Sequence, residues 1–165
     1  MSPKLQSMKQ YGNLLISKEG RVFMKNGEEY PYFFKFNRKG ETDGYKYVNI
    51  RSRATAVHKI MGRTWVKNPL PGVFDRVDHI SRIRTQNDTN NLRWVNAHLN
   101  AINRDNINTK WDADVHMWYA CYWCKGVESI VGWFSTFRDA HLATRRAKVQ
   151  LFDRVYNDAL TNNLA

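Results

Sequence analysis

The chain has 165 residues, of which 42% are hydrophobic and 13% aromatic, enough to build a compact core in one domain or two small ones. It carries 26 Lys and Arg against 15 Asp and Glu, a formal net charge of +11, which suits a polyanionic partner. Two cysteines, no apolar run of bilayer length and no charged-then-apolar leader exclude the disulfide-rich secreted and membrane classes, so we expect a cytoplasmic protein with no membrane partner.

The excess of positive charge lies in the first two thirds of the chain. Residues 1–60 hold twelve basic and five acidic side chains, residues 61–110 eight and four, and residues 111–165 six and six. Basic charge alone is weak evidence, because an ordinary solvated surface uses the same residues. Its distribution nevertheless predicts that a surface following a phosphate backbone lies before residue 110.

An antiparallel β meander is predicted over residues 11–50. Short β-branched or aromatic runs alternate there with turn-forming clusters, and the expected strands are LLIS, RVFM, YPYFFKF and YKYVNI. A helix is predicted next, over about residues 54–66, because apolar side chains recur at helical spacing at Val57, Ile60, Met61 and Trp65. Asn68-Pro69 closes this helix.

Asp78 and His79 are followed by Asn91, twelve residues after the histidine, and by Asn100, twenty-one residues after it. Hydrolysis of a phosphodiester needs a base for the proton of the water and a cation for the charge on the leaving oxygen. Oxygens of Asp78 and Asn100 are hard ligands of the kind that Mg²⁺ prefers, and His79 can act as a base near neutral pH. This pattern predicts a nuclease site with one Mg²⁺ or Mn²⁺ ion.

The strings VDHI and NNLRWVNAHLN resemble the HNH endonuclease motif of phage and intron homing enzymes. The resemblance implies a two-stranded ribbon and a helix folded round one divalent metal. It implies that Asp78 and Asn100 are metal ligands and that His79 is the general base. Asn91 is then the catalytic residue that orients the histidine and ties the loop. An isolated Asp-His pair is more often a turn or a surface pair, so this interpretation depends on the full spacing.

Two positions depart from the usual HNH pattern. Ser81-Arg82 stands where many relatives have Asp-Gly, which we interpret as a loop variation, and Asn100 stands in place of His, which marks the homing branch. The segment VHKIMGRTWVKNP also resembles the helix that homing HNH enzymes carry before the metal motif. His58 belongs to its packing pattern, and we interpret it as a core or interdomain histidine rather than a DNA contact.

After the Asn-rich linker AINRDNINTK, two or three strands and one helix are predicted. Thr136 and Asp139 form a capping-box start for that helix. The C-terminal part resembles the plant ethylene-response-factor type of DNA-binding domain, which implies a sheet that enters the major groove; the matching positions are Trp111, Ala113, Gly132, Phe134, Thr136 and Ala140. Cys121 and Cys124 would need two further ligands to hold zinc, so we interpret them as strand cysteines.

We therefore expect an α+β fold with an N-terminal antiparallel β meander, a ββα-metal HNH core and a C-terminal β-β-β-α domain. The predicted boundaries are 1–105, with the core at about 54–105, and 106–165. DNA contacts are predicted from basic residues outside the catalytic set: Arg51, Arg53, Arg82, Arg84, Lys110, Lys125, Arg145 and Arg146. Arg145 and Arg146 form, with Lys148, a basic helix patch that is either solvated or a phosphate contact.

The expected function is a site-specific homing or nicking endonuclease that hydrolyses double-stranded DNA to 5′-phosphate and 3′-hydroxyl ends. It would act as a monomer or homodimer, in the bacterial host cytoplasm if a phage encodes it. Two alternatives stay open at this point. One is a non-catalytic DNA-binding regulator on the same scaffold, and the other is a restriction or defence nuclease.

Overall fold

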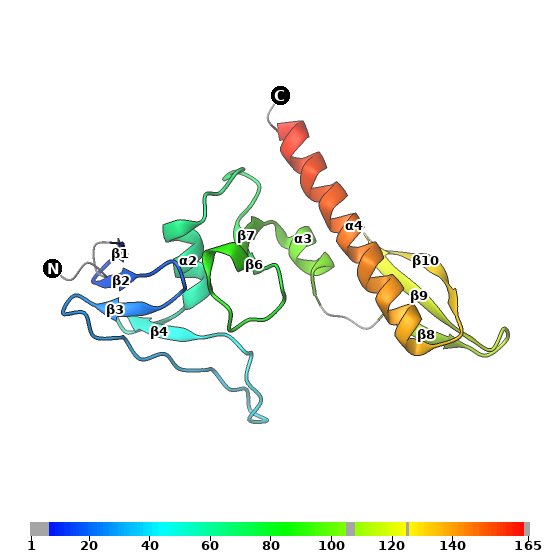
Figure 1. Cartoon of the computed structure of the whole chain (residues 1–165), viewed down its shortest axis with the longest axis horizontal. Helices are drawn as coiled ribbons and strands as arrows, with labels where there is room; N and C mark the ends of the chain where they lie inside the picture. The colour runs from blue at the N-terminus through cyan, green and yellow to red at the C-terminus, as the bar shows by residue number, and fades with distance from the viewer. Residues whose placement is uncertain (1–6, 105–107, 125, 164–165) are drawn as a thin grey trace. The chain divides into compact units, whose positions relative to one another are not determined.

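A computed structural model describes residues 7–104, 108–124 and 126–163 (Figure 1). These residues form several small antiparallel sheets and three α-helices, so the mixed α and β content predicted from the sequence is confirmed. Contacts divide the chain into two compact units, Met1–Asn96 and Ala97–Ala165. No helix within the described ranges is long and apolar enough to cross a membrane. Lys125, one of the predicted DNA contacts, lies outside the described residues.

The N-terminal unit begins with a three-stranded antiparallel sheet of β1 (Lys9–Tyr11), β2 (Leu14–Ile16) and β3 (Val22–Met24). Of the predicted meander strands, LLIS, RVFM and YKYVNI contain observed strands, whereas YPYFFKF does not form a regular strand. Residues 30–36 take part only in the isolated bridges Phe33↔Tyr47 and Phe36↔Thr42. This run is rich in aromatic residues, as strands often are. Phe36, however, is 66% exposed, so the run lacks the buried face that would stabilise regular strand pairing.

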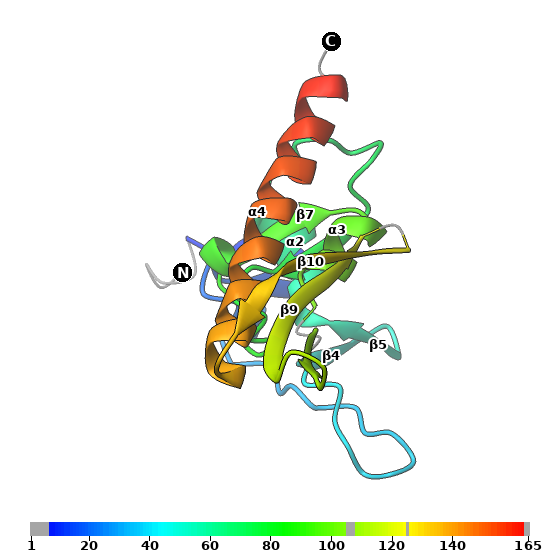
Figure 2. The ribbon, with the colours of Figure 1, turned by 90° about the vertical axis from the view of Figure 1, so that its right-hand side faces the viewer.

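The next strands form a separate hairpin. β4 (Tyr47–Ile50) pairs with β5 (Arg53–Ala56), and both are seen in Figure 2. Because residues 53–56 pair with β4, helix α2 spans Val57–Trp65 and begins three residues later than predicted. The buried face of α2 joins side chains of β2–β4 and β7 in one apolar core, whose buried members are Leu14, Ile16, Val22, Val48, Val57, Ile60, Met61 and Leu92.

A two-stranded antiparallel ribbon carries the Asp-His pair. β6 (Arg76–His79) pairs with β7 (Leu92–Val95), and the short 3₁₀ helix η1 (Thr89–Asn91) precedes β7. The helix α2 approaches β6 closely at Gly62, where a Cβ atom would collide with the side chain of Val77. Glycine at this position therefore allows the helix to support the strand that bears His79.

Helix α3 (Ala97–Ile102) follows β7 and belongs to the C-terminal unit. The predicted elements of a ββα motif thus occur in the expected chain order. The contact boundary at Asn96 falls before the domain boundary that we expected after residue 105, and the assignment of separate domains stays a prediction.

The rest of the C-terminal unit is a three-stranded antiparallel sheet with one long helix. β8 (Thr109–Asp112), β9 (Met117–Cys124) and β10 (Val127–Phe134) are arranged in the order β10-β9-β8. Helix α4 (Phe137–Asn163) packs along β9 and β10 (Figure 2). The predicted capping box is present, since the Thr136 hydroxyl accepts the Asp139 N–H at 3.1 Å and donates to the Asp139 carboxylate at 2.7 Å.

The basic patch predicted on α4 is smaller than expected. Arg145 and Arg146 are exposed, but Lys148 is only 6% exposed. The Lys148 ammonium donates to the Arg104 carbonyl at 2.6 Å. Helical spacing alone placed Lys148 with its charged neighbours, whereas the fold turns it toward α3.

Candidate functional site

The two side chains of the Asp-His pair are held in different ways on β6. Asp78 and His79 are both buried, at 9% and 3% exposure. Arg93, the cross-strand neighbour of Asp78 on β7, donates from Nε and Nη2 to Asp78 Oδ2 at 3.2 and 3.1 Å. Successive strand residues point to opposite faces, so the carboxylate and the imidazole are presented separately.

Asn87 holds the imidazole of His79. The distance from His79 Nε2 to Asn87 Oδ1 is 2.9 Å, and Asn87 is 4% exposed. An amide oxygen only accepts, so Nε2 carries the proton in this arrangement and Nδ1 carries the lone pair. The sequence had suggested Asn91 for this orienting role, and Asn87 was missed. One asparagine among several in a polar loop has no distinguishing signal in a single sequence.

Asn91 connects the two ends of the loop between β6 and β7. Its Oδ1 accepts the Ser81 N–H at 2.8 Å, its Nδ2 donates to the Gln86 carbonyl at 2.8 Å, and its backbone carbonyl accepts the Ile80 N–H at 2.8 Å. Asn91 is 9% exposed, so these bonds lie largely away from water. They fix the loop that carries Asn87.

The turn between β2 and β3 packs against the loop between β6 and β7. Gly20 has φ of 80°, and a Cβ atom there would lie 2.6 Å from the Asn87 carbonyl oxygen. The Thr89 N–H donates to the Lys18 carbonyl at 3.0 Å. A glycine is therefore needed at position 20 both for its backbone conformation and for the close approach to Asn87.

Two further rings lie beside His79. The ring of His58 on α2 is 5.1 Å from that of His79, and the ring of Tyr45 is 4.6 Å from His58 and 5.8 Å from His79. Burial lowers the pKa of His79 below its ordinary value. Burial, and next the charge of His79, lower the pKa of His58 to about 3. Both imidazoles are thus neutral near pH 7.

The structure explains one departure from the HNH pattern. Arg82 stands where that pattern has glycine, and its φ of 67° is the left-handed conformation that glycine adopts without strain. Its N–H donates to the His79 carbonyl at 3.0 Å. The turn geometry is therefore kept although the residue differs.

Asn100 lies on α3, in the C-terminal unit, and is half-buried. Its role as a metal ligand stays a prediction. Among the residues that the structure describes, no group of three or more His, Cys, Asp or Glu side chains is arranged to hold a metal ion.

Four of the predicted DNA contacts lie in the N-terminal unit. Arg51 and Arg53 are exposed at the tip of the β4–β5 hairpin, and Arg82 lies in the loop after β6. Arg84 is exposed but also binds within the unit, since it donates to the Asp43 carbonyl at 2.7 Å and lies over the Tyr45 ring at 5.0 Å.

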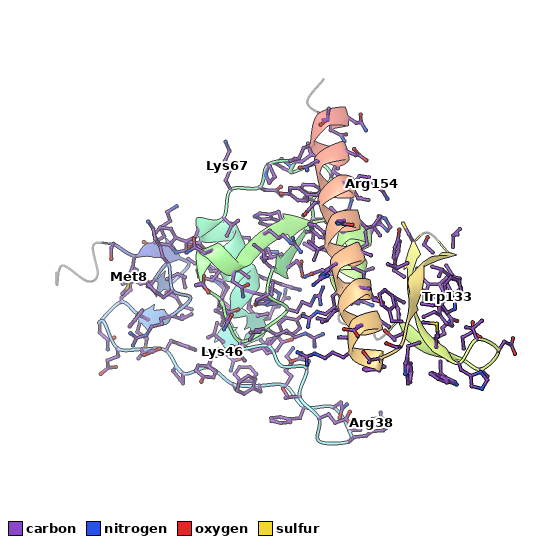
Figure 3. All side chains as sticks on the ribbon, turned by 45° about the vertical axis from the view of Figure 1, so that its right-hand side comes forward. Met8, Arg38, Lys46, Lys67, Trp133 and Arg154 are labelled. Carbon is purple, nitrogen blue, oxygen red and sulfur yellow. The ribbon has the colours of Figure 1, made fainter. Side chains whose placement is uncertain are left out.

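The open face of the C-terminal sheet is aromatic rather than basic. Cross-strand pairing places Tyr119 beside Trp133 and Lys110, and Figure 3 shows Trp133 on the side of the sheet away from α4. Lys110 is paired with Glu128 at 2.6 Å. Trp118 instead contacts Phe137 of α4 at 5.1 Å between ring centroids. The arginines that the ethylene-response-factor resemblance implies for this face are absent from the described strands.

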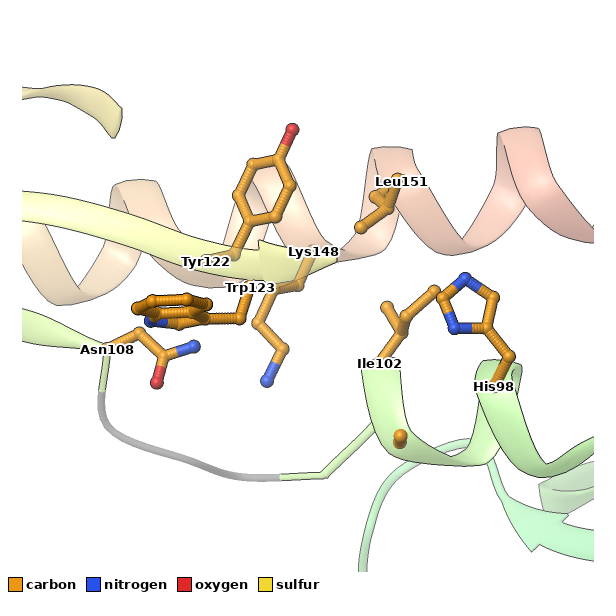
Figure 4. A pocket seen from close by; sticks show the side chains of 8 residues that line it. His98, Ile102, Asn108, Tyr122, Trp123, Lys148 and Leu151 are labelled. Carbon is orange, nitrogen blue, oxygen red and sulfur yellow. The ribbon is translucent and has the colours of Figure 1, made fainter. Parts of the chain in front are cut away.

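The two cysteines do not converge. Residues three apart on a strand lie on opposite faces, and Cys121 Sγ contacts Asn108 and Glu128 at 3.3 and 3.2 Å, whereas Cys124 Sγ lies 3.9 Å from His98 Nε2. Near His98 there is a pocket of about 320 Å³, shown in Figure 4. Its lining includes Trp123 and Lys148 and has no carboxylate.

Sequence similarity to one known protein supports the HNH resemblance. No protein-family model matches the sequence. The chain is 30% identical over 102 residues to an uncharacterized HNH endonuclease of Acanthamoeba polyphaga mimivirus; the match covers 59% of this chain and 29% of that protein. This chain therefore spans less than a third of its relative's length. A solved structure titled "DNA binding and cleavage by the HNH homing endonuclease I-HmuI" aligns with a TM-score of 0.41 and 23% identity, over 56% of this chain and 51% of the other.

Proposed function

We propose that this chain is a divalent-metal-dependent DNA endonuclease of the HNH type, a site-specific homing or nicking enzyme. The observation that carries the proposal is the His79 imidazole, buried beside Asp78 and held through Nε2 by Asn87 at 2.9 Å. The similarity to the mimivirus HNH endonuclease supports the same activity.

His79 is suited to act as the general base. With Nε2 bonded to the Asn87 oxygen, Nδ1 is the nitrogen that takes the proton of the attacking water. The lowered pKa of His79 keeps the ring unprotonated at neutral pH, which a base requires. Asn87 holds the imidazole plane, and Asn91 holds the loop on which Asn87 lies.

The donor chemistry of Asp78 and Asn100 fits Mg²⁺ or Mn²⁺. These residues offer a carboxylate and an amide oxygen, and Mg²⁺ usually combines one or two such protein ligands with waters and substrate phosphate oxygens. When bound, the ion would supply positive charge that offsets the charge developing on the leaving 3′ oxygen. Both bonds from Arg93 end on Oδ2 of Asp78 and so restrict the orientation of its carboxylate. The products are a 5′-phosphate and a 3′-hydroxyl.

The charge of the N-terminal unit supports double-stranded DNA as the substrate. Residues 1–96 hold eighteen Lys and Arg against eight Asp and Glu, while residues 97–165 hold eight against seven. Residues 44–74 contain six Lys and Arg and no carboxylate side chain at all. An excess of Lys and Arg attracts the phosphate backbone of DNA, whatever the base sequence.

A supercoiled plasmid assay tests the proposal. With Mg²⁺, one active site cuts one strand, so nicked circles should appear before linear DNA, and a chelator should stop the reaction. His79→Ala should lose about 10² to 10⁴-fold in cleavage rate, the usual contribution of a general base. Its DNA affinity should be unchanged, because the basic side chains remain. Wild-type protein that does not cleave, or an alanine variant that nicks at the wild-type rate, would contradict the proposal.

A further inference from the structure

Three rings from distant parts of the N-terminal unit meet at His79. Tyr45 precedes β4, His58 lies in the first turn of α2, and His79 ends β6. The distance between ring centroids is 4.6 Å for Tyr45 and His58, 5.1 Å for His58 and His79, and 5.8 Å for Tyr45 and His79. His58 and His79 are 6% and 3% exposed, so this is a closed contact rather than a surface one.

His58 is an unusual residue for a buried apolar position. It lies between Val57 and Ile60, which belong to the apolar core, yet its Nδ1 has no hydrogen-bond partner among the residues that the structure describes. A buried polar atom without a partner lowers stability, and such atoms call for an explanation. Because Nδ1 forms no hydrogen bond with any described residue, what the structure shows for this side chain is the contact of its flat ring with Tyr45 and His79.

We propose that His58, together with Tyr45, is a positioning residue that fixes the ring plane of His79. The inference rests on the proposed role of His79 as the base. The hydrogen bond from Nε2 to Asn87 fixes one edge of the imidazole but leaves the ring able to tilt about that bond. Two rings packed against it at interplanar angles of 59° (His58) and 37° (Tyr45) restrict this freedom, so Nδ1 keeps a constant direction.

The partners of the two positioning rings are consistent with this role. Burial is the main cause that lowers the pKa of His58 to about 3, so His58 is neutral and its ring adds no charge beside His79. Tyr45 is held in turn: its N–H donates to Asp43 Oδ1 at 3.1 Å, and the guanidinium of Arg84 lies 5.0 Å from its ring centroid. Asp43, in the loop before β4, and Arg84, in the loop after β6, therefore both hold Tyr45 in the ring cluster.

Three variants test the inference. His58→Ala removes the ring, His58→Phe restores a flat ring without nitrogens, and Val57→Ala opens a cavity at the adjacent buried residue of α2. Each is measured for its unfolding midpoint, for kcat and KM of Mg²⁺-dependent nicking on an oligonucleotide duplex, and for the imidazole ¹⁵N shifts of His79. The His79 signals are assigned by their loss in His79→Ala.

We expect His58→Ala to lower kcat by about 10²-fold with little change in KM, the size of effect that a misplaced reacting group produces. Its His79 ¹⁵N shifts should move from those of the Nε2-protonated form toward an average of both tautomers. His58→Phe should recover most of kcat and the wild-type shifts. Val57→Ala should lower the unfolding midpoint while leaving kcat and the shifts unchanged.

The inference is overturned if His58→Ala keeps the wild-type kcat and His79 shifts. It is also overturned if kcat falls in Val57→Ala as it does in His58→Ala, which would indicate a general loss of stability. A folded His58→Phe protein as impaired as His58→Ala would show that the nitrogens, not the ring, matter. If the wild-type protein cleaves no DNA, the proposed function fails, but the ¹⁵N shifts still decide whether His58 fixes the His79 ring.

Discussion

The groups that hold His79 are uncharged, which suits the proton-accepting role proposed for it. Asn87 contacts its Nε2, and the rings of His58 and Tyr45 pack against it in tilted contacts. A carboxylate in the place of Asn87 would raise the pKa of His79, so the ring would stay protonated up to a higher pH. An amide fixes the direction of the ring without this effect, so orientation and basicity are set by different neighbours.

Acid should destabilise the protein through His58. Its pKa is about 3 in the folded protein against an ordinary 6.5, so the unfolded chain binds more protons between these values. Stability is then complete above pH 6.5 and decreases as the pH falls. We expect the wild-type protein to lose roughly 2 kcal/mol more than His58→Phe between pH 7 and 5, measured by urea unfolding. Val57→Ala should keep the wild-type pH dependence; an identical dependence in His58→Phe would contradict the prediction.

The two predicted metal ligands should differ in importance. Asp78→Ala should abolish Mg²⁺-dependent nicking, and Asn100→Ala should weaken it more at low than at high Mg²⁺, because loss of a charged oxygen ligand costs more than loss of a neutral one. The check is the nicking rate over a Mg²⁺ titration, with unfolding midpoints to confirm that both variants fold. Calorimetry that gives unchanged Mn²⁺ affinity for both would place the metal elsewhere in the chain.

At the scale of elements, the β4–β5 hairpin has a turn that its residues do not favour. Arg51 and Ser52 form a two-residue loop with φ of 47° and 61°, because Ile50 pairs directly with Arg53. Such loops with two positive φ angles favour Asn-Gly, since other residues are strained there. The charged tip is therefore kept at some cost in stability, which is typical of segments that make functional contacts.

Replacing this tip should separate stability from binding. Arg51→Asn with Ser52→Gly should raise the free energy of unfolding by about 1–2 kcal/mol, because the strain is relieved. The same protein should bind duplex DNA more weakly at one stated salt concentration. Arg38→Asn is the matched control, because this substitution also removes one positive charge. Arg38 lies at the tip of the long loop that precedes β4 (Figure 3). Equal weakening by both variants would show that only net charge matters at the hairpin.

For the whole molecule, the uneven charge implies that the N-terminal unit would provide most of the attraction to the DNA substrate proposed above. The C-terminal sheet offers Tyr119, Trp123 and Trp133, with Lys110 already paired with Glu128. Surfaces of this kind contribute local contacts rather than long-range attraction. The aromatic face is thus better suited to discrimination among sequences than to capture of the duplex.

The salt dependence of DNA binding should reflect this division. Arg53→Gln should flatten the slope of log affinity against log salt by about 0.9, the value for one neutralised phosphate contact. Lys110→Gln should flatten it less, because Glu128 compensates this charge at 2.6 Å. The measurement is the dissociation constant at four or more salt concentrations. If both variants changed the slope equally, Lys110 of the C-terminal sheet would also contact a DNA phosphate.

Several features were determined by the sequence itself. The spacing of Asp78, His79, Asn91 and Asn100 carries the resemblance to the HNH motif, on which the proposed site depends. Thr136 and Asp139 indicated the start of α4, and the charge counts indicated which part of the chain is basic. These features depend on residues close in sequence or on composition alone. Their interactions are therefore encoded locally, by helix capping, strand alternation and formal charge.

The tertiary structure decided the rest. It selected Asn87 among the loop asparagines, brought His58 and Tyr45 against His79, turned Lys148 away from solvent and left residues 30–36 without regular pairing. Each of these outcomes depends on contacts between segments far apart in the chain. Hydrophobic periodicity and local propensity do not specify such contacts, because they report which face of an element is buried and not which neighbour buries it.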